Sequence, residues 1–388
     1  MMDLIATIGG ATGSLGMTLI AFLVVLTVIV FVHEFGHFWV GRMCGVGVTA
    51  FSIGFGRELF GWTDKRGTRW KLSAIPLGGY VKFVGDLNAA SVPDQENLDG
   101  MTPEQRAVSF PHKNVAKRAA IVAAGPVANF ILAILIFAGF NYVNGRAVIE
   151  PRIEVVQAGS VAEKAGFQAK DRVLTINGRS IDAFEDMVRL VSSSGGEALA
   201  FTVERAGQTV TLNATPEFDL RSTPFGKQRV GKLGVEASRD PASVRRLSYS
   251  AWGALKAGAV ETWNLVDRTL NFIRRLILGW ESTDQLSGPI GIARVSGTAF
   301  DLGGVYSLVS LIGFMSVSIG LINLFPIPLL DGGHLLFYAI EAVRGRPLSE
   351  KAQEIGFRIG FAIVAMLMLF ATWNDLVHLG TSFLAPGT

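Results

Sequence analysis

The chain is poor in cysteine and in charged residues. Its 388 residues include a single cysteine, Cys44, so an intramolecular disulfide cannot form. Charged residues make up 17% of the sequence, whereas soluble globular domains average about 25%. The net charge of +3 is too small to indicate a nucleic-acid partner. The low charge, together with 49% hydrophobic residues, favours a membrane protein.

The pattern of a cleavable signal peptide is also missing. The first apolar run follows Asp3 without a basic segment, and no small-residue cleavage site comes after it. We therefore expect a retained transmembrane helix there. Crossing a bilayer takes ~20 apolar residues, and four segments qualify. The predicted spans are residues 1–40, 119–143, 305–335 and 356–380.

Lysine and arginine are concentrated between the spans. Residues 41–118 and 336–355 are rich in both, whereas the two chain ends contain neither. Because cytoplasmic loops carry the excess of positive charge, we expect these two segments inside and both termini outside. The long segment between the second and third spans is then also outside.

This outer segment divides into three predicted parts. Residues 148–216 alternate like strands around one helix near residues 183–192, which predicts a small α/β domain. Residues 217–240 are predicted to be a linker. Residues 241–304 hold an amphipathic helix and a connecting segment. The apolar stripe of this helix is compatible with two roles, gating access from the membrane interface or packing as a surface helix.

The inner loop contains an apolar stretch with a turn signal. In "TRWKLSAIPLGGYVKF", residues 68–83, two strand-like runs flank "PLGG". We expect a β-hairpin that re-enters the membrane. Backbone at that depth has to be shielded by protein or line a cavity.

The end of the first span carries the pattern H-E-x-x-H. His33 and His37 are one helical turn apart on one face, so both imidazoles can bind one Zn²⁺. Glu34 is rotated by ~100° and can accept a proton from the attacking water. The alternatives are a chance match and two histidines that satisfy each other. Ionisable residues in a membrane span are costly and usually functional, which favours the metal site.

Asp331 is the preferred third ligand. A catalytic zinc usually has three protein ligands and an open position. Asp331 lies in "NLFPIPLLDGGH", at the inner end of the third span, where an acidic side chain needs a partner. The alternative is that it caps the following helix. The other histidines are His112, His334 and His378.

The residues around Asp331 predict an irregular backbone. Pro326 and Pro328 exclude a regular helix before it, and Gly332 and Gly333 allow a tight turn after it. His334 lies one turn further on and suits a supporting or surface role better than that of a ligand.

Together these motifs resemble the site-2 protease family of intramembrane zinc metalloproteases, especially its bacterial regulator-of-sigma-E-protease type. Four further stretches carry the resemblance. "GPVAN" resembles the family's second-span motif, and "IPLGGYVKF" its membrane re-entrant β-loop. "GSVAEKAGFQAKDRVLTINGRSI" resembles a PDZ domain, and "LSGPIGIA" the segment before the third span.

The resemblance implies a zinc endopeptidase of the bacterial inner membrane. It implies that one zinc ion is held by His33, His37 and Asp331, with Glu34 activating water. Implied substrates are single-pass membrane proteins, such as an anti-sigma factor already cut by an upstream protease, or leftover signal peptides. The expected substrate-binding residues are Asn323, Asn129, Pro326, Pro328, Gly79 and Tyr80.

The chain departs from the family in its outer domain. It has one PDZ-like region where some members have two, and Lys170 replaces the usual glycine of a Gly-Asp pair. This domain is expected to bind peptide or to act as a size filter. Two other functions compete with the protease. Metal transporters often have paired inverted repeats, and this sequence shows no second copy of either motif. A scaffold that uses only the PDZ-like domain leaves the zinc motifs unexplained.

Overall fold

The computed structural model describes most of the chain in two compact units. The described residues are 2–86, 100–223, 226–238, 244–281, 283 and 286–384. The first unit comprises residues 1–137, 261–266 and 286–388, and the second comprises residues 138–260 and 267–285. Each unit is described by itself below.

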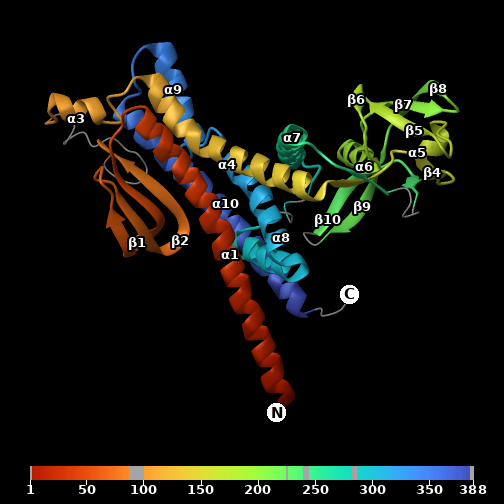
Figure 1. Cartoon of the computed structure of the whole chain (residues 1–388), viewed down its shortest axis with the longest axis horizontal. Coiled ribbons are helices and arrows are strands. Elements are labelled where there is room, and N and C mark those ends of the chain that lie inside the picture. The colour runs from red at the N-terminus through yellow and green to blue at the C-terminus, as the bar shows by residue number, and fades with distance from the viewer. Residues whose placement is uncertain are drawn as a thin grey trace. The chain divides into compact units, whose positions relative to one another are not determined.

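In the part of the chain that the structure describes, four long helices are apolar enough to cross a membrane. They are α1 (Met2–Met43), α4 (Val115–Asn144), α8 (Pro289–Asn323) and α10 (Glu350–Leu384) (Figure 1). Each contains an 18-residue window with at most two charged residues. Their number and length fit a polytopic membrane protein. Two shorter helices in the same unit are α3 (Pro103–Val108) and α9 (Asp331–Arg344).

The third apolar segment differs from its predicted bounds of 305–335. α8 starts at Pro289 and breaks at Gly303 and Gly304, where Gly304 has φ 57° and ψ −143°, a conformation open to glycine. It ends at Asn323, before Pro326 and Pro328, which cannot continue a helix. The residues from 331 onwards form a separate helix, α9.

α1 packs along α8 through an apolar ridge. Ala21, Val25 and Ile29 are spaced four apart and are buried against Leu308 and Ile312 of α8. Residues four apart form a continuous ridge on a helix surface. His33 and His37 continue this spacing, so the packing that fixes α1 also fixes the direction of both imidazoles.

The predicted hairpin at residues 68–83 is wrong in its pairing. Residues Arg69–Phe83 form one bent strand, β2, which pairs with β1 (Val48–Thr63). Residues 50–53 of β1 lie between the two arms of β2, opposite 69–72 on one side and 79–82 on the other. The two runs flanking "PLGG" are therefore separated by another stretch of chain. A local turn signal could not reveal this, because the inserted residues precede it in sequence.

One end of this sheet is buried and the other is exposed. Phe51, Val81 and Phe83 pack in a core with Ile121 and Val122 of α4. The opposite end presents apolar side chains at the surface. These are Phe55, Leu59, Phe60, Leu72 and Ile75, and Trp62 is also exposed, on the strand edge beside Trp70.

The second unit is built from short strands around a buried core. Its main sheet has the strand order β6-β5-β7-β8 and packs on α6, with Val173, Phe201 and Met187 fully buried. The strands are β3 (Arg146–Ile149), β4 (Ile153–Val156), β5 (Arg172–Ile176), β6 (Arg179–Ser180), β7 (Leu199–Arg205), β8 (Gln208–Ala214), β9 (Glu217–Thr223), β10 (Gly226–Lys232), β11 (Val235–Ala237) and β12 (Val244–Leu247). The helices are α5 (Val161–Lys164), α6 (Phe184–Ser193) and α7 (Ala251–Ile277).

The linker and helix predicted after residue 216 differ from the structure. The predicted linker, residues 217–240, contains the β9–β10 hairpin, and β11 pairs with β4. The predicted helix from 241 begins only at Ala251, because residues 244–247 form β12 and pair with β3. The domain therefore extends beyond its predicted range of 148–216, mainly through the strands that follow residue 216.

Lys170 occupies a position suited to glycine. Its φ of 73° lies in the left-handed region, which costs a residue with a side chain about 1 kcal/mol. The glycine expected from the Gly-Asp pair would adopt it without this cost. The next residue, Asp171, is buried, and its carboxylate forms a two-point ion pair with Arg205 at 2.7 and 2.8 Å.

Removing Arg205 should destabilise this domain strongly. Arg205→Met leaves the buried Asp171 carboxylate without its counter-charge, so we expect a loss of about 3 kcal/mol. Hydrogen exchange of the β5 and β7 amides in the full chain should then accelerate by about 100-fold. Arg172→Met, which removes an exposed pair at 3.8 Å, is the control and should cost less than about 1 kcal/mol. Equal effects of the two substitutions would contradict the buried-pair interpretation.

Candidate metal and catalytic site

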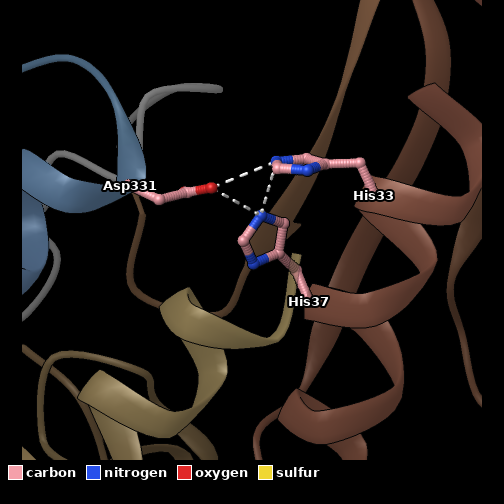
Figure 2. Close-up of side chains that lie close together, drawn as sticks. All are labelled: His33, His37 and Asp331. Atoms are coloured by element: carbon pink, nitrogen blue, oxygen red, sulfur yellow. Dashed lines mark hydrogen bonds and ion pairs between the residues drawn. The ribbon is translucent and has the colours of Figure 1, made fainter. Parts of the chain in front are cut away.

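Three potential metal ligands converge from two helices. His33 and His37 come from α1, Asp331 is the first residue of α9, and the three side chains point toward one another (Figure 2). The Nε2 atoms of the histidines are 3.2 Å apart. Asp331 Oδ2 lies 3.1 Å from His33 Nε2 and 3.5 Å from His37 Nε2.

These spacings match a tetrahedral zinc site. Zinc binds nitrogen and oxygen ligands at about 2.0–2.1 Å, so two ligands of a tetrahedron lie about 3.3 Å apart. The three observed distances bracket this value. Asp331 Oδ2 is also buried without a hydrogen-bond partner among the described residues, as suits an atom that binds a cation. The donor set therefore fits one Zn²⁺ with a fourth position left open.

The backbone before α9 places Asp331 at the site. Leu329 has φ 105°, an unusual value for a residue with a side chain. The N-cap of α9 is Leu330, and no side-chain capping bond forms there, so the alternative that Asp331 caps the helix is wrong.

Gly332 and Gly333 serve close packing instead of the predicted tight turn. A Cβ on Gly332 would lie 2.2 Å from Phe325 O, and one on Gly333 would lie 2.4 Å from Ile327 O. Neither has a positive φ. The two glycines let the first turn of α9 press against the preceding loop, which brings Asp331 to the histidines.

One face of α4 supports both imidazoles. Ile121, Gly125 and Asn129 are spaced four apart and lie beside His37 and His33. His37 Nδ1 donates to the Ile121 carbonyl at 2.9 Å, and His33 Nδ1 lies 3.2 Å from Asn129 Nδ2. A Cβ on Gly125 would be 2.3 Å from His37 Nε2, so only glycine leaves room for the rings. Both Nε2 atoms are thereby directed at Asp331.

Glu34 lies beside the ligands in a cavity of about 320 Å³. Its Cγ would be 2.9 Å from a Cβ on Gly79, so its side chain lies against this part of β2. Gly79, Tyr80 and Asn323, which the sequence predicts to bind substrate, also line this cavity, and their contact with substrate stays a prediction. The cavity is therefore lined by the three potential ligands, by Glu34 and by the arm of β2 that contains Gly79 and Tyr80.

Three other predicted substrate-binding residues do not line this cavity. Asn129 is fully buried, with its Nδ2 3.2 Å from His33 Nδ1, and its contact with substrate stays a prediction. Pro328 packs on α10, where Gly356 and Gly360 leave space for it. Pro326 is likewise absent from the described lining. The prolines shape the loop that carries Asp331, and their contact with substrate stays a prediction.

His334, whose role the sequence left open, connects two cavities. It lines the 320 Å³ cavity and a larger one of about 890 Å³ that also borders Arg118 and Glu341. Its ring packs against Phe357, and burial lowers its pKa. It is not part of the three-ligand group found among the described residues.

Sequence reasoning missed Gly125 and the Ile121 carbonyl. "GPVAN" was assigned through resemblance alone, although the four-residue spacing of Ile121, Gly125 and Asn129 matches that of the two histidines. This shared spacing was the available signal. The carbonyl itself leaves no trace in the side-chain sequence.

Known proteins resemble the chain along nearly its whole length. A protein of Agrobacterium fabrum named as a zinc metalloprotease is 48% identical over 96% of this chain and 99% of its own. The metalloprotease MmpA of Caulobacter vibrioides is 44% identical over 92% of this chain and 95% of its own. A PDZ domain from Listeria monocytogenes covers 22% of this chain and 84% of its own at 11% identity, but its TM-score of 0.18 carries no argument.

The family model described as Peptidase family M50 matches residues 21–367. This range includes both histidines on α1, the supporting face of α4 and Asp331 on α9. The chain belongs to peptidase family M50, the site-2 protease family of zinc metalloproteases.

Proposed function

We propose that this zinc metalloprotease is an intramembrane endopeptidase that cleaves the transmembrane segments of single-pass membrane proteins. The observation that carries the proposal is the position of the site. His33, Glu34 and His37 lie on a helix that is long and apolar enough to cross a membrane. Ionisable groups in a membrane span are energetically costly and are usually functional.

The residues divide the chemistry among them. His33, His37 and Asp331 would hold Zn²⁺, which as a Lewis acid polarises a carbonyl and lowers the pKa of water. Glu34, beside these ligands, takes the proton from the attacking water and delivers it to the leaving amine. His33 and His37 are kept in position by α4, and Asp331 by the turn before α9.

A substrate helix has to be unwound before it can be cut. Its peptide bonds are otherwise satisfied by their own helix. The arm of β2 with Gly79 and Tyr80 borders the cavity and has β1 on its other side, so it can pair with an extended substrate. Asn323, which also lines this cavity, would bind the substrate backbone. The exposed apolar end of this sheet is suited to re-entering the membrane.

The remaining parts suit regulated intramembrane proteolysis in a bacterial inner membrane. We place both termini and the PDZ-like domain outside, with the site near the cytoplasmic face. The domain would bind peptide or exclude uncut substrates, so that an upstream protease acts first. Suitable substrates are pre-cut anti-sigma factors and leftover signal peptides. The 890 Å³ cavity shares the lining residue His334 with the site and would give water a route to it.

Glu34→Gln should abolish cleavage and leave zinc binding intact. Removing a general base slows the chemical step by about 10²–10⁴-fold, whereas the three ligands remain. The measurement is cleavage of a co-expressed single-pass substrate, with the cut mapped by mass spectrometry, and the zinc content of the purified protein. Glu104→Gln, the same change at an exposed site on α3, is the control and should cut normally.

Two results would overturn the proposal. One is cleavage by well-expressed Glu34→Gln at the wild-type rate. The other is a cut mapped outside the apolar segment of the substrate, since the proposed site lies within the membrane.

Asp331→Ala should lose both zinc and activity. It removes one of three protein ligands, so the purified variant should contain far less than one zinc per chain. Stoichiometric zinc in this variant would show that the third ligand lies elsewhere.

Gly125→Ala should weaken zinc binding by at least ~10-fold. The new Cβ would lie 2.3 Å from His37 Nε2 and 2.9 Å from His33 Cε1, so the rings have to move. Gly139→Ala on the same helix is the control, because nothing lies within 4 Å of its Cβ position. Chelator competition measures both affinities. Equal affinities would contradict the tight fit described around the rings.

A further inference from the structure

Asn129 is a polar side chain buried completely in an apolar helix. Its Nδ2 lies 3.2 Å from His33 Nδ1, and its Oδ1 is buried without a hydrogen-bond partner among the described residues. Leaving a buried acceptor without a hydrogen bond is unfavourable. A leucine of similar size would avoid this cost, so the carboxamide needs a reason to be there.

The chemistry of His33 supplies that reason. A histidine that coordinates a metal through Nε2 carries its proton on Nδ1, which makes Nδ1 a donor. Asn Nδ2 is also only a donor and cannot bond to it. The two ends of a carboxamide have nearly the same shape, so a half-turn of the side chain places Oδ1 against Nδ1 instead.

We propose that Asn129 is the positioning residue of His33, accepting the Nδ1–H hydrogen bond through Oδ1. This bond fixes the tautomer whose Nε2 lone pair faces Asp331. It also holds the ring against rotation about its χ2 axis. The inference rests on the proposed role of His33 as a zinc ligand and replaces the predicted contact between Asn129 and substrate.

The neighbouring histidine, His37, has a comparable Nδ1 hydrogen bond whose acceptor is a backbone carbonyl of α4. His37 Nδ1 donates to the Ile121 carbonyl at 2.9 Å, two helical turns before Asn129 on α4. The group recorded next to His33 Nδ1 is instead a side chain, that of Asn129 on the same face of α4. Ser316 of α8 donates to the Asn129 backbone carbonyl at 2.9 Å, which holds this turn of α4 in place.

The test compares two substitutions of similar volume in the purified full chain. Asn129→Asp keeps an acceptor at the ring, whereas Asn129→Leu removes it. Zinc affinity, measured by chelator competition, should fall about 10–100-fold for Asn129→Leu and stay within a few-fold of wild type for Asn129→Asp. This readout does not depend on proteolysis.

Ser316→Ala separates positioning from packing. It removes a buried hydrogen bond from the same turn of α4 without touching His33, so it should lower the melting temperature and leave zinc affinity unchanged. His33→Ala tests the underlying ligand assignment and should lose zinc.

The outcomes separate the inference from the proposed function. Wild-type affinity in Asn129→Leu, or equal losses in the Asp and Leu variants, overturns the positioning role and leaves the zinc ligands untouched. Wild-type affinity in His33→Ala overturns the ligand assignment and the inference with it. A loss confined to Asn129→Leu, with Ser316→Ala unaffected, supports the role.

Discussion

The site depends on the close approach of α1 to α4. A Cβ on Gly36 would lie 2.3 Å from the Ala124 carbonyl, and one on Gly125 would strike His37. Two glycines, one on each helix, therefore let the backbones come near enough for the imidazoles to reach acceptors on α4. Without this contact the histidines would still share a face of α1, but nothing would fix their rotamers or their tautomers.

The same contact satisfies polar groups where water is scarce. In apolar surroundings an unpaired imidazole or carboxamide is expensive, so each has to find a protein partner. The histidine side of the site does so with α4, and the aspartate side is left to the metal. Two buried oxygens at the site lack a hydrogen-bond partner among the described residues, Oδ2 of Asp331 and Oδ1 of Asn129. The first of them faces both imidazole Nε2 atoms, where a cation would bind.

The sequence predicted the parts of this site that follow from local spacing. The H-E-x-x-H pattern fixes His33 and His37 on one helical face, and apolar length identifies the four long helices. The arrangement of β1 between the arms of β2, and the pairing of β11 with β4 and of β12 with β3 in the second unit, could not be predicted this way. Both depend on pairing between segments far apart in the chain, and a local turn signal carries no information about such pairing.

Asn129 and the two glycines after Asp331 show a different limit. A sequence motif gives the identity of a residue, but it does not say which groups that residue will contact in the fold. Gly332 and Gly333 were expected to turn the chain and instead admit a neighbouring backbone. Asn129 is expected to face the substrate, and in the structure it lies fully buried beside His33. In each case only the position of another helix or loop decides which function a small or polar residue serves.

Metal binding should in turn stabilise the fold that creates the site. The ligands come from helices almost three hundred residues apart in sequence, and Leu329 holds a conformation that costs about 1–3 kcal/mol. A zinc ion bound by both helices favours the folded arrangement over any in which they separate, and its binding free energy can offset that strain. The strained turn places Asp331 opposite the histidines, and zinc makes that placement stable. The strain at Leu329 and the affinity for metal are therefore thermodynamically linked, because both depend on how closely α9 is held to α1.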